Sequence, residues 1–329
     1  MKTRVLGTAS PPDRAAAVTA AVRALRNGQP VALPTETVYG LAADALKPAA
    51  ALKIFAAKER PRFDPLIVHV PAREWLAEIT RLEGASMFLF DRLIAEFWPG
   101  PLTLVLPRSE MVPDVVTAGL RTVAVRMSAS KLFGEIIAAF GRPLAAPSAN
   151  RFGKISPTSA ADVLDELGGR IPLIIDGGRT TLGIESTVVA VHNGEIEVLR
   201  RGPITAEQLR HVAPVTFAGS SNRPKAPGQL ATHYAPATPL RLVTDASAIR
   251  LPTGKRCGLL AYHATETTRF VEIRRLSPNI DVAAADLFRL LRELDQARLD
   301  LIVAEEVPEI GIGSAINDRL RRAAAKRSL

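Results

Sequence analysis

The chain has 329 residues, of which 47% are hydrophobic and 23% charged, with a formal net charge of +9 at pH 7. This length allows two domains, each with its own core, and the apolar runs fall well short of the roughly 20 residues that span a membrane. A single cysteine, Cys257, excludes an internal disulfide and a multi-cysteine zinc site. The excess of cations favours anionic partners such as nucleotides, phosphate or RNA, but a uniformly basic chain with no such partner explains the charge equally well.

The first predicted elements are a helix and a short buried strand. A polar segment follows Met1–Arg4, so we expect no signal peptide and a cytoplasmic location. Residues 13–27 predict an amphipathic helix that stops at Gly28. The strand Val31–Leu33 then runs into Pro34–Thr37, whose hydroxyls and carboxylate either serve a ligand or only satisfy a turn.

Cations and one histidine follow within a dozen residues. A helix over 49–58 is predicted to end in a cluster of Lys58, Arg60 and Arg62, ahead of a strand at Leu66–Val70. Cations at a helix C-terminus are favourable in any case, yet three of them at a sheet edge are typical of a phosphate clamp. His69 lies within the strand, where it is either a core residue or a ligand.

A second cation lies on a strand further along the chain. After a helix over 86–97 and a strand at Leu102–Leu106, the run Thr122–Arg126 alternates in polarity. Residues two and four apart in a strand share a face, so Thr122 and Arg126 are predicted to point the same way. That face either directs a hydroxyl and a guanidinium at one anion or is simply solvated.

Hydroxyl and amide side chains crowd the loop over 142–158, ahead of a predicted helix over 159–167. Such loops bind anions at helix N-termini, although Ser156 or Thr158 could equally be plain N-caps. A strand at Ile171–Asp176 and a hairpin turning at Asn193-Gly194 then lead to Arg200.

The composition changes to Pro, Ser, Gly and Ala over 213–239, which predicts an interdomain linker. We therefore divide the chain into a catalytic domain over 1–212, the linker, and a small α/β domain over 240–329. The elements predicted for the last part are strands at Leu240–Val243, Cys257–Tyr262 and Leu301–Ala304 and helices at 281–297 and 314–326.

The common catalytic signatures are absent from the sequence, including phosphate-binding Gly-rich loops, a His-Glu-x-x-His motif and a nucleophile elbow. What remains is a basic cleft at strand ends that suits a triphosphate and a second, carboxylate-bearing substrate. Catalysis there would rest on positioning and charge neutralisation. These residues alone leave a nucleotide-using enzyme and an RNA-binding protein as alternatives.

Several ordered motifs resemble the threonylcarbamoyl-AMP synthase family of YrdC-like proteins, in its long, two-domain form. The motifs are Pro34-Thr-Glu-Thr-Val-Tyr-Gly-Leu41, Lys58-x-Arg60-Pro61, Pro65-Leu-Ile-Val-His69, Trp98-Pro-Gly-Pro-Leu-Thr103, Ala146-Pro-Ser-Ala-Asn150, Ser156-Pro-Thr158, Glu185-Ser-Thr187, Pro227-Gly228, His233-Tyr-Ala-Pro236 and Gly311-Ile-Gly-Ser-Ala-Ile-Asn-Asp-Arg-Leu320. The resemblance implies an α/β fold, with a YrdC-like twisted open mixed sheet around a concave basic cleft and a smaller, Rossmann-like C-terminal domain.

The resemblance also implies a reaction and its partners. The family condenses L-threonine, bicarbonate and ATP into threonylcarbamoyl-AMP and pyrophosphate, with Mg²⁺ held through the ATP phosphates rather than by protein ligands. The product serves the modification of tRNA beside the anticodon, so threonylcarbamoyl-transfer machinery and tRNA itself are further expected partners.

Site residues follow from the motifs that match the family. Lys58, Arg60 and Arg126 are expected to be catalytic, and Tyr234 to fold over the cleft from the linker and exclude water. The expected ATP site comprises Lys58, Arg60, Asp64, Thr122, Ser148, Asn150, Ser156, Arg200 and Tyr234, and the expected threonine site comprises Thr35, His69, Arg126, Ala146 and Ser186.

Two positions depart from the family pattern. Asp64 stands where Asn is common, so its anion needs compensation by Mg²⁺ or Arg62, and Gln229 stands where Met is frequent. The competing interpretations are a non-catalytic YrdC/YciO-type protein that binds double-stranded RNA or tRNA, and a YciO-type paralogue of different activity. A threonine pocket separates the synthase from a binding module, which needs only basic residues.

Overall fold

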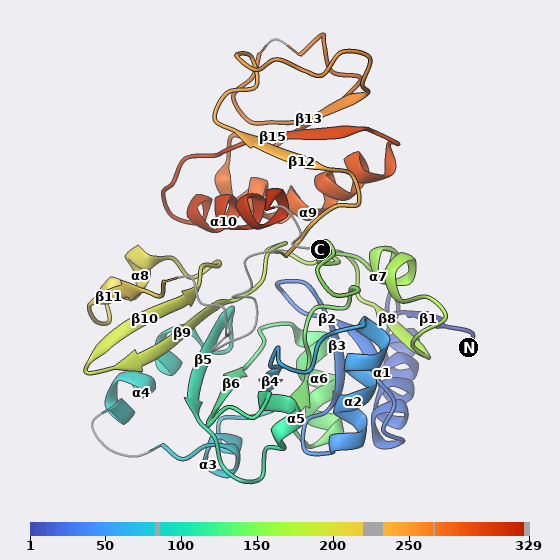
Figure 1. The fold of residues 1–329 in the computed structure, drawn as a ribbon. Helices are drawn as coiled ribbons and strands as arrows, with labels where there is room; N and C mark the ends of the chain where they lie inside the picture. Colours follow the sequence, from blue (N-terminus) through green and yellow to red (C-terminus); the bar gives the residue numbers. More distant parts are fainter. Residues whose placement is uncertain (83–85, 220–232, 266, 326–329) are drawn as a thin grey trace.

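The computed structural model describes residues 1–82, 86–219, 233–265 and 267–325 (Figure 1). Within these ranges the chain forms an eleven-stranded mixed sheet and a four-stranded parallel sheet. None of the helices described there is long and apolar enough to cross a membrane. The predicted fold class, a large mixed α/β sheet with a smaller α/β unit, is confirmed.

The large sheet is built from strands that are distant in sequence. Their spatial order is β1 (Arg4–Gly7), β8 (Leu173–Asp176), β2 (Val31–Pro34), β3 (Tyr39–Asp44), β7 (Leu144–Ala145), β4 (Ile67–His69), β6 (Thr122–Arg126), β5 (Leu102–Pro107), β9 (Thr187–His192), β10 (Glu195–Arg200) and β11 (Val215–Phe217). The helices of this part are α1 (Pro11–Arg26), α2 (Pro48–Lys58), α3 (Trp75–Ile79), α4 (Ser86–Phe97), α5 (Asp114–Thr117), α6 (Lys131–Phe140), α7 (Ala160–Leu167) and α8 (Ala206–Arg210).

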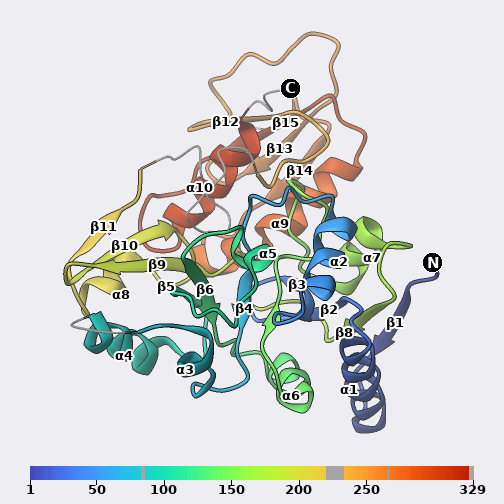
Figure 2. The same ribbon diagram turned by 60° about the horizontal axis from the view of Figure 1, so that its bottom comes forward.

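Alternate residues of a central strand enter different cores because side chains in a strand point to opposite faces in turn. On β2, Val31 and Leu33 pack with α1 and α6, whereas Ala32 belongs to the cluster that contains α2 and α4. Figure 2 shows α1 and α6 side by side, apart from α2. Both faces of the sheet are thus covered by helices, so a ligand can reach the sheet only at the ends of its strands.

The second sheet has the order β12 (Leu240–Val243), β15 (Leu301–Glu305), β13 (Cys257–Ala261) and β14 (Glu272–Arg275). Helices α9 (Ile280–Gln296) and α10 (Gly313–Ala324) lie between this sheet and the large one (Figure 1). Their apolar residues form one cluster with Val38, Ile155 and Ile184 of the large unit. The two units therefore share a core along their contact.

The structure also contains elements that the sequence did not predict. The segment after Tyr39, expected to lead straight into a helix, forms the antiparallel strand β3. The interdomain segment predicted over 213–239 begins with β11, which extends the large sheet to Phe217. Pro227, Gly228 and Gln229 lie outside the described residues.

Candidate active site

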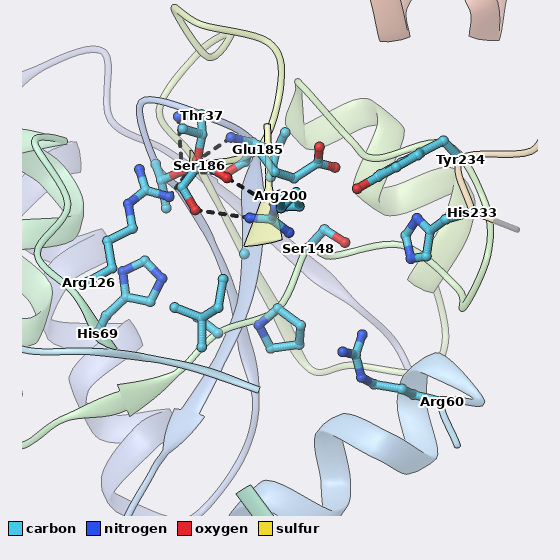
Figure 3. Close-up of a pocket in the computed structure, with 16 residues that line it drawn as sticks. Thr37, Arg60, His69, Arg126, Ser148, Glu185, Ser186, Arg200, His233 and Tyr234 are labelled. Atoms are coloured by element: carbon cyan, nitrogen blue, oxygen red, sulfur yellow. Dashed lines mark hydrogen bonds between the residues drawn. The ribbon is translucent and has the colours of Figure 1, made fainter. Parts of the chain in front are cut away.

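A pocket opens at the ends of the central strands, beside His233 and Tyr234 of the segment that joins the two units (Figure 3). Its position follows from strand register, because His69 at the end of β4 pairs with Arg126 at the end of β6, which in turn lies opposite Thr103 of β5. The lining residues are Thr35, Thr37, Val38, Gly40, Arg60, Ile67, His69, Arg126, Ala146, Pro147, Ser148, Glu185, Ser186, Arg200, His233 and Tyr234.

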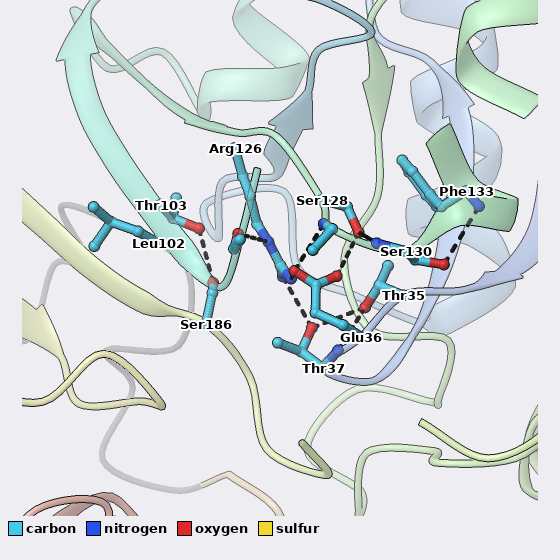
Figure 4. A network of polar contacts seen from close by, with 12 residues as sticks. Thr35, Glu36, Thr37, Leu102, Thr103, Arg126, Ser128, Ser130, Phe133 and Ser186 are labelled. Carbon is cyan, nitrogen blue, oxygen red and sulfur yellow. Dashed lines mark hydrogen bonds and ion pairs between the residues drawn. The ribbon is translucent and has the colours of Figure 1, made fainter. Parts of the chain in front are cut away.

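Arg126 is fixed by a network of polar contacts (Figure 4). Its Nη2 lies 2.5 Å from Oε1 of Glu36, Nη1 donates to Oγ1 of Thr37 at 2.9 Å, and Nε donates to the carbonyl of Gly100 at 3.2 Å. Burial alone would raise the pKa of Glu36, but Arg126 and hydrogen bonds from Ser128 and the Ala129 amide lower it to about 2. Glu36 is therefore ionised and holds the guanidinium in place.

His69 is a neutral, buried imidazole beside this cation. Burial, together with the charge of Arg126, lowers its pKa to about 3. Its ring packs against Phe133 with a centroid distance of 4.8 Å, and Nδ1 has no hydrogen-bond partner among the described residues. A ring nitrogen next to the pocket is thus available to a ligand.

Arg60 and Asp64 form a buried ion pair at the opposite end of the pocket. Nη2 of Arg60 lies 2.8 Å from Oδ2 of Asp64, and Nε donates to the Asp64 carbonyl at 3.1 Å. The charge of Asp64 is thus compensated by Arg60 and not by Arg62, which is exposed. The expected cluster of three cations is reduced to Lys58 and Arg60.

Lys58 stands behind the pocket wall. Its Nζ donates to the carbonyls of Ser148 and Asn150 at 2.6 and 2.5 Å, and the residue is 1% exposed. Burial and the neighbouring Arg60 lower the pKa of this amine well below its ordinary value. Lys58 therefore fixes the loop that presents Ser148 to the pocket.

Arg200 and Ser186 form the third side of the pocket. Arg200 donates from Nε to the carbonyl of Ser186 at 3.0 Å and from Nη2 to its Oγ at 3.0 Å. The same Oγ lies 2.7 Å from Oγ1 of Thr103, the register neighbour of Arg126. The hydroxyl of Ser186 therefore connects Arg200 with Thr103, which lies beside Arg126 in the sheet.

Five predicted site residues lie outside the pocket lining: Lys58 and Asp64, described above, and Asn150, Ser156 and Thr122. Asn150 and Ser156 are buried, Asn150 bonding to its own loop and Ser156 donating to Glu185 at 2.5 Å. Thr122 starts β6 opposite Pro107, four residues before Arg126, so the two do not meet at one point although they share a strand face. The N-cap of α7 is Ser159, not Ser156 or Thr158.

Glu36, Thr37, Glu185 and His233 line the pocket or bind its cations but were not assigned to a substrate from the sequence, which left Glu36 and Thr37 as either ligand or turn residues. All four lie within the quoted motifs, one or two positions from a predicted site residue, and this proximity is the sequence signal that could have identified them. In the described part of the chain, no group of three or more His, Cys, Asp or Glu side chains could hold a metal ion.

Comparisons with known proteins agree over most of the chain. One family model, described as Telomere recombination, matches residues 23–202, and another, described as Threonylcarbamoyl-AMP synthase, C-terminal domain, matches residues 204–325. Threonylcarbamoyl-AMP synthases of Pyrococcus abyssi and Bacillus subtilis are 40% and 39% identical, covering 92% of this chain and 92% and 91% of theirs.

Solved structures of similar fold agree with these sequence matches. The crystal structure of P. abyssi Sua5 complexed with L-threonine superposes with a TM-score of 0.89 at 37% identity, and 98% of each chain is covered. Escherichia coli YciO superposes with a TM-score of 0.51 over 61% of this chain at 19% identity, which is a likeness of fold.

Proposed function

The chain belongs to the threonylcarbamoyl-AMP synthase family, and on this premise we propose that it joins L-threonine, bicarbonate and ATP into threonylcarbamoyl-AMP with release of pyrophosphate. In class it is an enzyme that transfers a nucleotidyl group from ATP. The product is the activated precursor for the modification of tRNA beside the anticodon. The threonylcarbamoyl-transfer machinery and tRNA are its proposed later partners.

The observation that carries this proposal is a pair of buried arginines in one pocket. Arg126 and Arg200 are 3% and 6% exposed, come from different strands and both line the cavity that holds Ser186 (Figure 3). Buried, pre-oriented guanidinium groups suit carboxylate and phosphate groups of small molecules. Two such sites in one pocket fit two anionic substrates.

Threonine is assigned to the Arg126 side. Its carboxylate would bind the guanidinium, and the neutral ring of His69 can hydrogen-bond without adding charge. Small and hydroxyl-bearing residues complete that side of the pocket, namely Thr35, Ala146 and Ser186.

ATP is assigned to the side formed by Arg60, Arg200, Ser148 and Tyr234. Lys58, Asn150 and Ser156 would support this side through the loop they hold, and Asp64 through its pair with Arg60. Thr122 keeps its predicted ATP contact as a proposal that would require the nucleotide to extend beyond the pocket.

The proposed chemistry needs positioning more than a reactive side chain. The amine of threonine combines with bicarbonate to give a carbamate and water, and a carbamate oxygen then attacks the α-phosphorus, with pyrophosphate leaving. The arginines would stabilise charge that develops on the phosphorus centre and the leaving group. We assign no protein general base.

Mg²⁺ is proposed to bind through the ATP phosphates. The pocket carboxylates are already used, Glu36 by Arg126 and Glu185 by Arg319, so they do not form a set of free oxygen ligands. When bound, the ion would neutralise phosphate charge.

RNA binding is the second candidate for a basic protein. A nucleic-acid backbone contacts cations that reach the surface, whereas Arg60, Arg126 and Arg200 are all less than 9% exposed. Their burial favours the small-molecule reaction at this pocket.

Pyrophosphate release from ATP, bicarbonate and Mg²⁺ tests the proposal when it is measured with and without L-threonine. We expect release to depend on threonine and to fall at least about 100-fold in Arg126→Ala. Arg121→Ala is the control, because Arg121 is exposed and lies outside the pocket lining. Release that does not depend on threonine would contradict the proposal.

A further inference from the structure

Arg319 of α10 connects the C-terminal unit to the wall of the pocket. Arg319 is completely buried, and its Nε lies 3.1 Å from Oε2 of Glu185, a residue that lines the pocket. Its Nη1 donates to the carbonyl of Arg201 at 2.7 Å. One guanidinium thus ties α10 to the two segments on either side of the hairpin β9–β10.

The second group held by Arg319 is Tyr234, which lines the pocket beside His233 (Figure 3). The Arg319 guanidinium lies 5.3 Å from the centre of the tyrosine ring. Phe288 of α9 stacks on the same ring, with centroids 5.5 Å apart and planes inclined by 26°. Cation–π and stacking contacts of this kind orient an aromatic ring.

Tyr234 needs such contacts because its backbone is in the left-handed region, with φ of 63°. That conformation costs a non-glycine residue roughly 1–2 kcal/mol. The amide of its C-terminal neighbour, Ala235, donates to the Gly153 carbonyl at 2.9 Å. Side-chain contacts from the C-terminal unit therefore offset a strained position at the mouth of the pocket.

The segment that carries Glu185 is clamped by the same unit. Gly183 has φ of 70°, and a Cβ at this position would lie 2.3 Å from the carbonyl oxygen of Ala285 on α9. On its other carboxylate oxygen, Glu185 accepts a hydrogen bond from Ser156 at 2.5 Å. Glu185 is thus fully committed to Arg319 and Ser156, which makes it a structural anchor of the pocket wall.

We propose that Arg319 is a positioning residue of the active site, through which the C-terminal unit holds Glu185 and Tyr234 in the arrangement that closes the pocket. This role rests on the proposed function, because it assigns Arg319 to that reaction. Arg319 does not touch the reacting atoms and acts through the two residues that it contacts. The C-terminal unit is accordingly part of the synthase site, with α9 and α10 forming the support of its cover.

Amide hydrogen exchange in the full-length protein tests the positioning without relying on activity. In Arg319→Met we expect the Ala235 amide to exchange at least about 10-fold faster, because its cover is released. The Leu259 amide in the centre of β13 serves as the reference for global unfolding. Arg321→Met is the control, since Arg321 is on the same helix but exposed, and its guanidinium pairs with Glu306 and Glu309 rather than with a pocket residue.

Unchanged exchange at Ala235 would overturn the proposal. Equal acceleration at Ala235 and Leu259 would also overturn it, because Arg319 would then only stabilise the whole protein. Should Arg319→Met not fold, Arg319→Lys is measured in its place, because lysine keeps the charge but cannot reach Glu185 and Arg201 together.

Kinetics test the link to the reaction. We expect Arg319→Met to lower kcat/KM for threonine by about 10- to 100-fold, Arg319→Lys to recover part of the loss, and Arg321→Met to match the wild type. Combining Arg319→Met with Tyr234→Leu should cost little more than the worse single change, because both remove the same cover. If the losses in kcat/KM of the two single variants multiply in the double variant, the positioning role of Arg319 is contradicted. If the wild type shows no threonine-dependent pyrophosphate release, the proposed function is contradicted, and hydrogen exchange alone then tests whether Arg319 holds Tyr234.

Discussion

The guanidinium of Arg126 and the carboxylate of Glu36 form a buried ion pair with Nη2 and Oε1 2.5 Å apart, their side chains being 4% and 10% exposed. Arg126 is the residue to which we assign the carboxylate of threonine, so the substrate would approach a cation that already has an internal partner. The pair keeps Arg126 ordered before the substrate arrives, which reduces the entropy lost on binding.

This ion pair predicts a specific dependence of stability on pH. The pKa of Glu36 is lowered from 4.5 to about 2 in the folded protein, so its stabilisation is complete above pH 4.5 and is lost as the pH falls toward 2. Glu36→Gln should destabilise the protein by about 3 kcal/mol at pH 6 but only by about 1 kcal/mol at pH 3. Chemical denaturation at both values measures this, and a destabilisation that does not change with pH would contradict the account.

His69 should not titrate in the physiological range. Its pKa of about 3 keeps the imidazole neutral from pH 5 to 8. We expect His69→Gln to raise KM for threonine about tenfold and to leave the shape of the pH profile of kcat/KM unchanged over that range. An ionisation near pH 6.5 that disappears in the variant would show that His69 acts as a proton donor or acceptor instead.

Substitutions at two glycines distinguish the cost of backbone strain from the cost of disturbing the contact between the two units. Both Gly178 and Gly183 have positive φ, but a Cβ meets nothing within 4 Å at Gly178, whereas at Gly183 it meets Ala285 of α9. Gly178→Ala should cost about 1 kcal/mol of unfolding free energy. Gly183→Ala should cost more and also reduce activity, because the segment carrying Glu185 must move. Equal effects on unfolding and on activity would argue against a tight contact with α9.

We expect Glu305 to stabilise the C-terminal unit. It is completely buried and accepts hydrogen bonds from the backbone amides of Ala246, Tyr262, His263 and Ala264 at 2.7–2.9 Å. Burial would raise its pKa, but these amides lower it overall. Glu305→Gln should reduce the unfolding free energy by about 3 kcal/mol.

The matched control for that change is Glu306→Gln, at the adjacent position, where the carboxylate pairs with the exposed Arg321. We expect it to cost less than about 1 kcal/mol. Similar losses in the two variants, measured by denaturant titration, would contradict the role given to Glu305.

The sequence predicted the elements whose pattern is long or sharply punctuated. The helix over 86–97 and the hairpin at Asn193-Gly194 are present as predicted, because amphipathic periodicity and a turn with two positive φ values are local properties. Strand β3 was missed because Tyr39–Asp44 is buried on both faces and shows no alternation. Strand β14, with the sequence Glu-Ile-Arg-Arg, is a polar edge strand and gives no apolar signal.

The candidate site was predictable where it follows motifs and not where it depends on tertiary contact. Strand periodicity placed Thr122 and Arg126 on one face, but four residues of strand separate them by about 13 Å, so a shared face does not direct both at one anion. The contact between Glu185 and Arg319 joins residues 134 positions apart, in separate units. No local pattern reports such a pairing.

The most direct test of the central claim is the incorporation of isotopically labelled bicarbonate into an adenylate. The wild type is incubated with ATP, Mg²⁺ and labelled bicarbonate, with and without L-threonine, beside Arg126→Ala. We predict a labelled threonylcarbamoyl-AMP that forms only with threonine and is lost in the variant. Absence of label from any adenylate in the presence of threonine, or equal labelling by Arg126→Ala, would contradict the account.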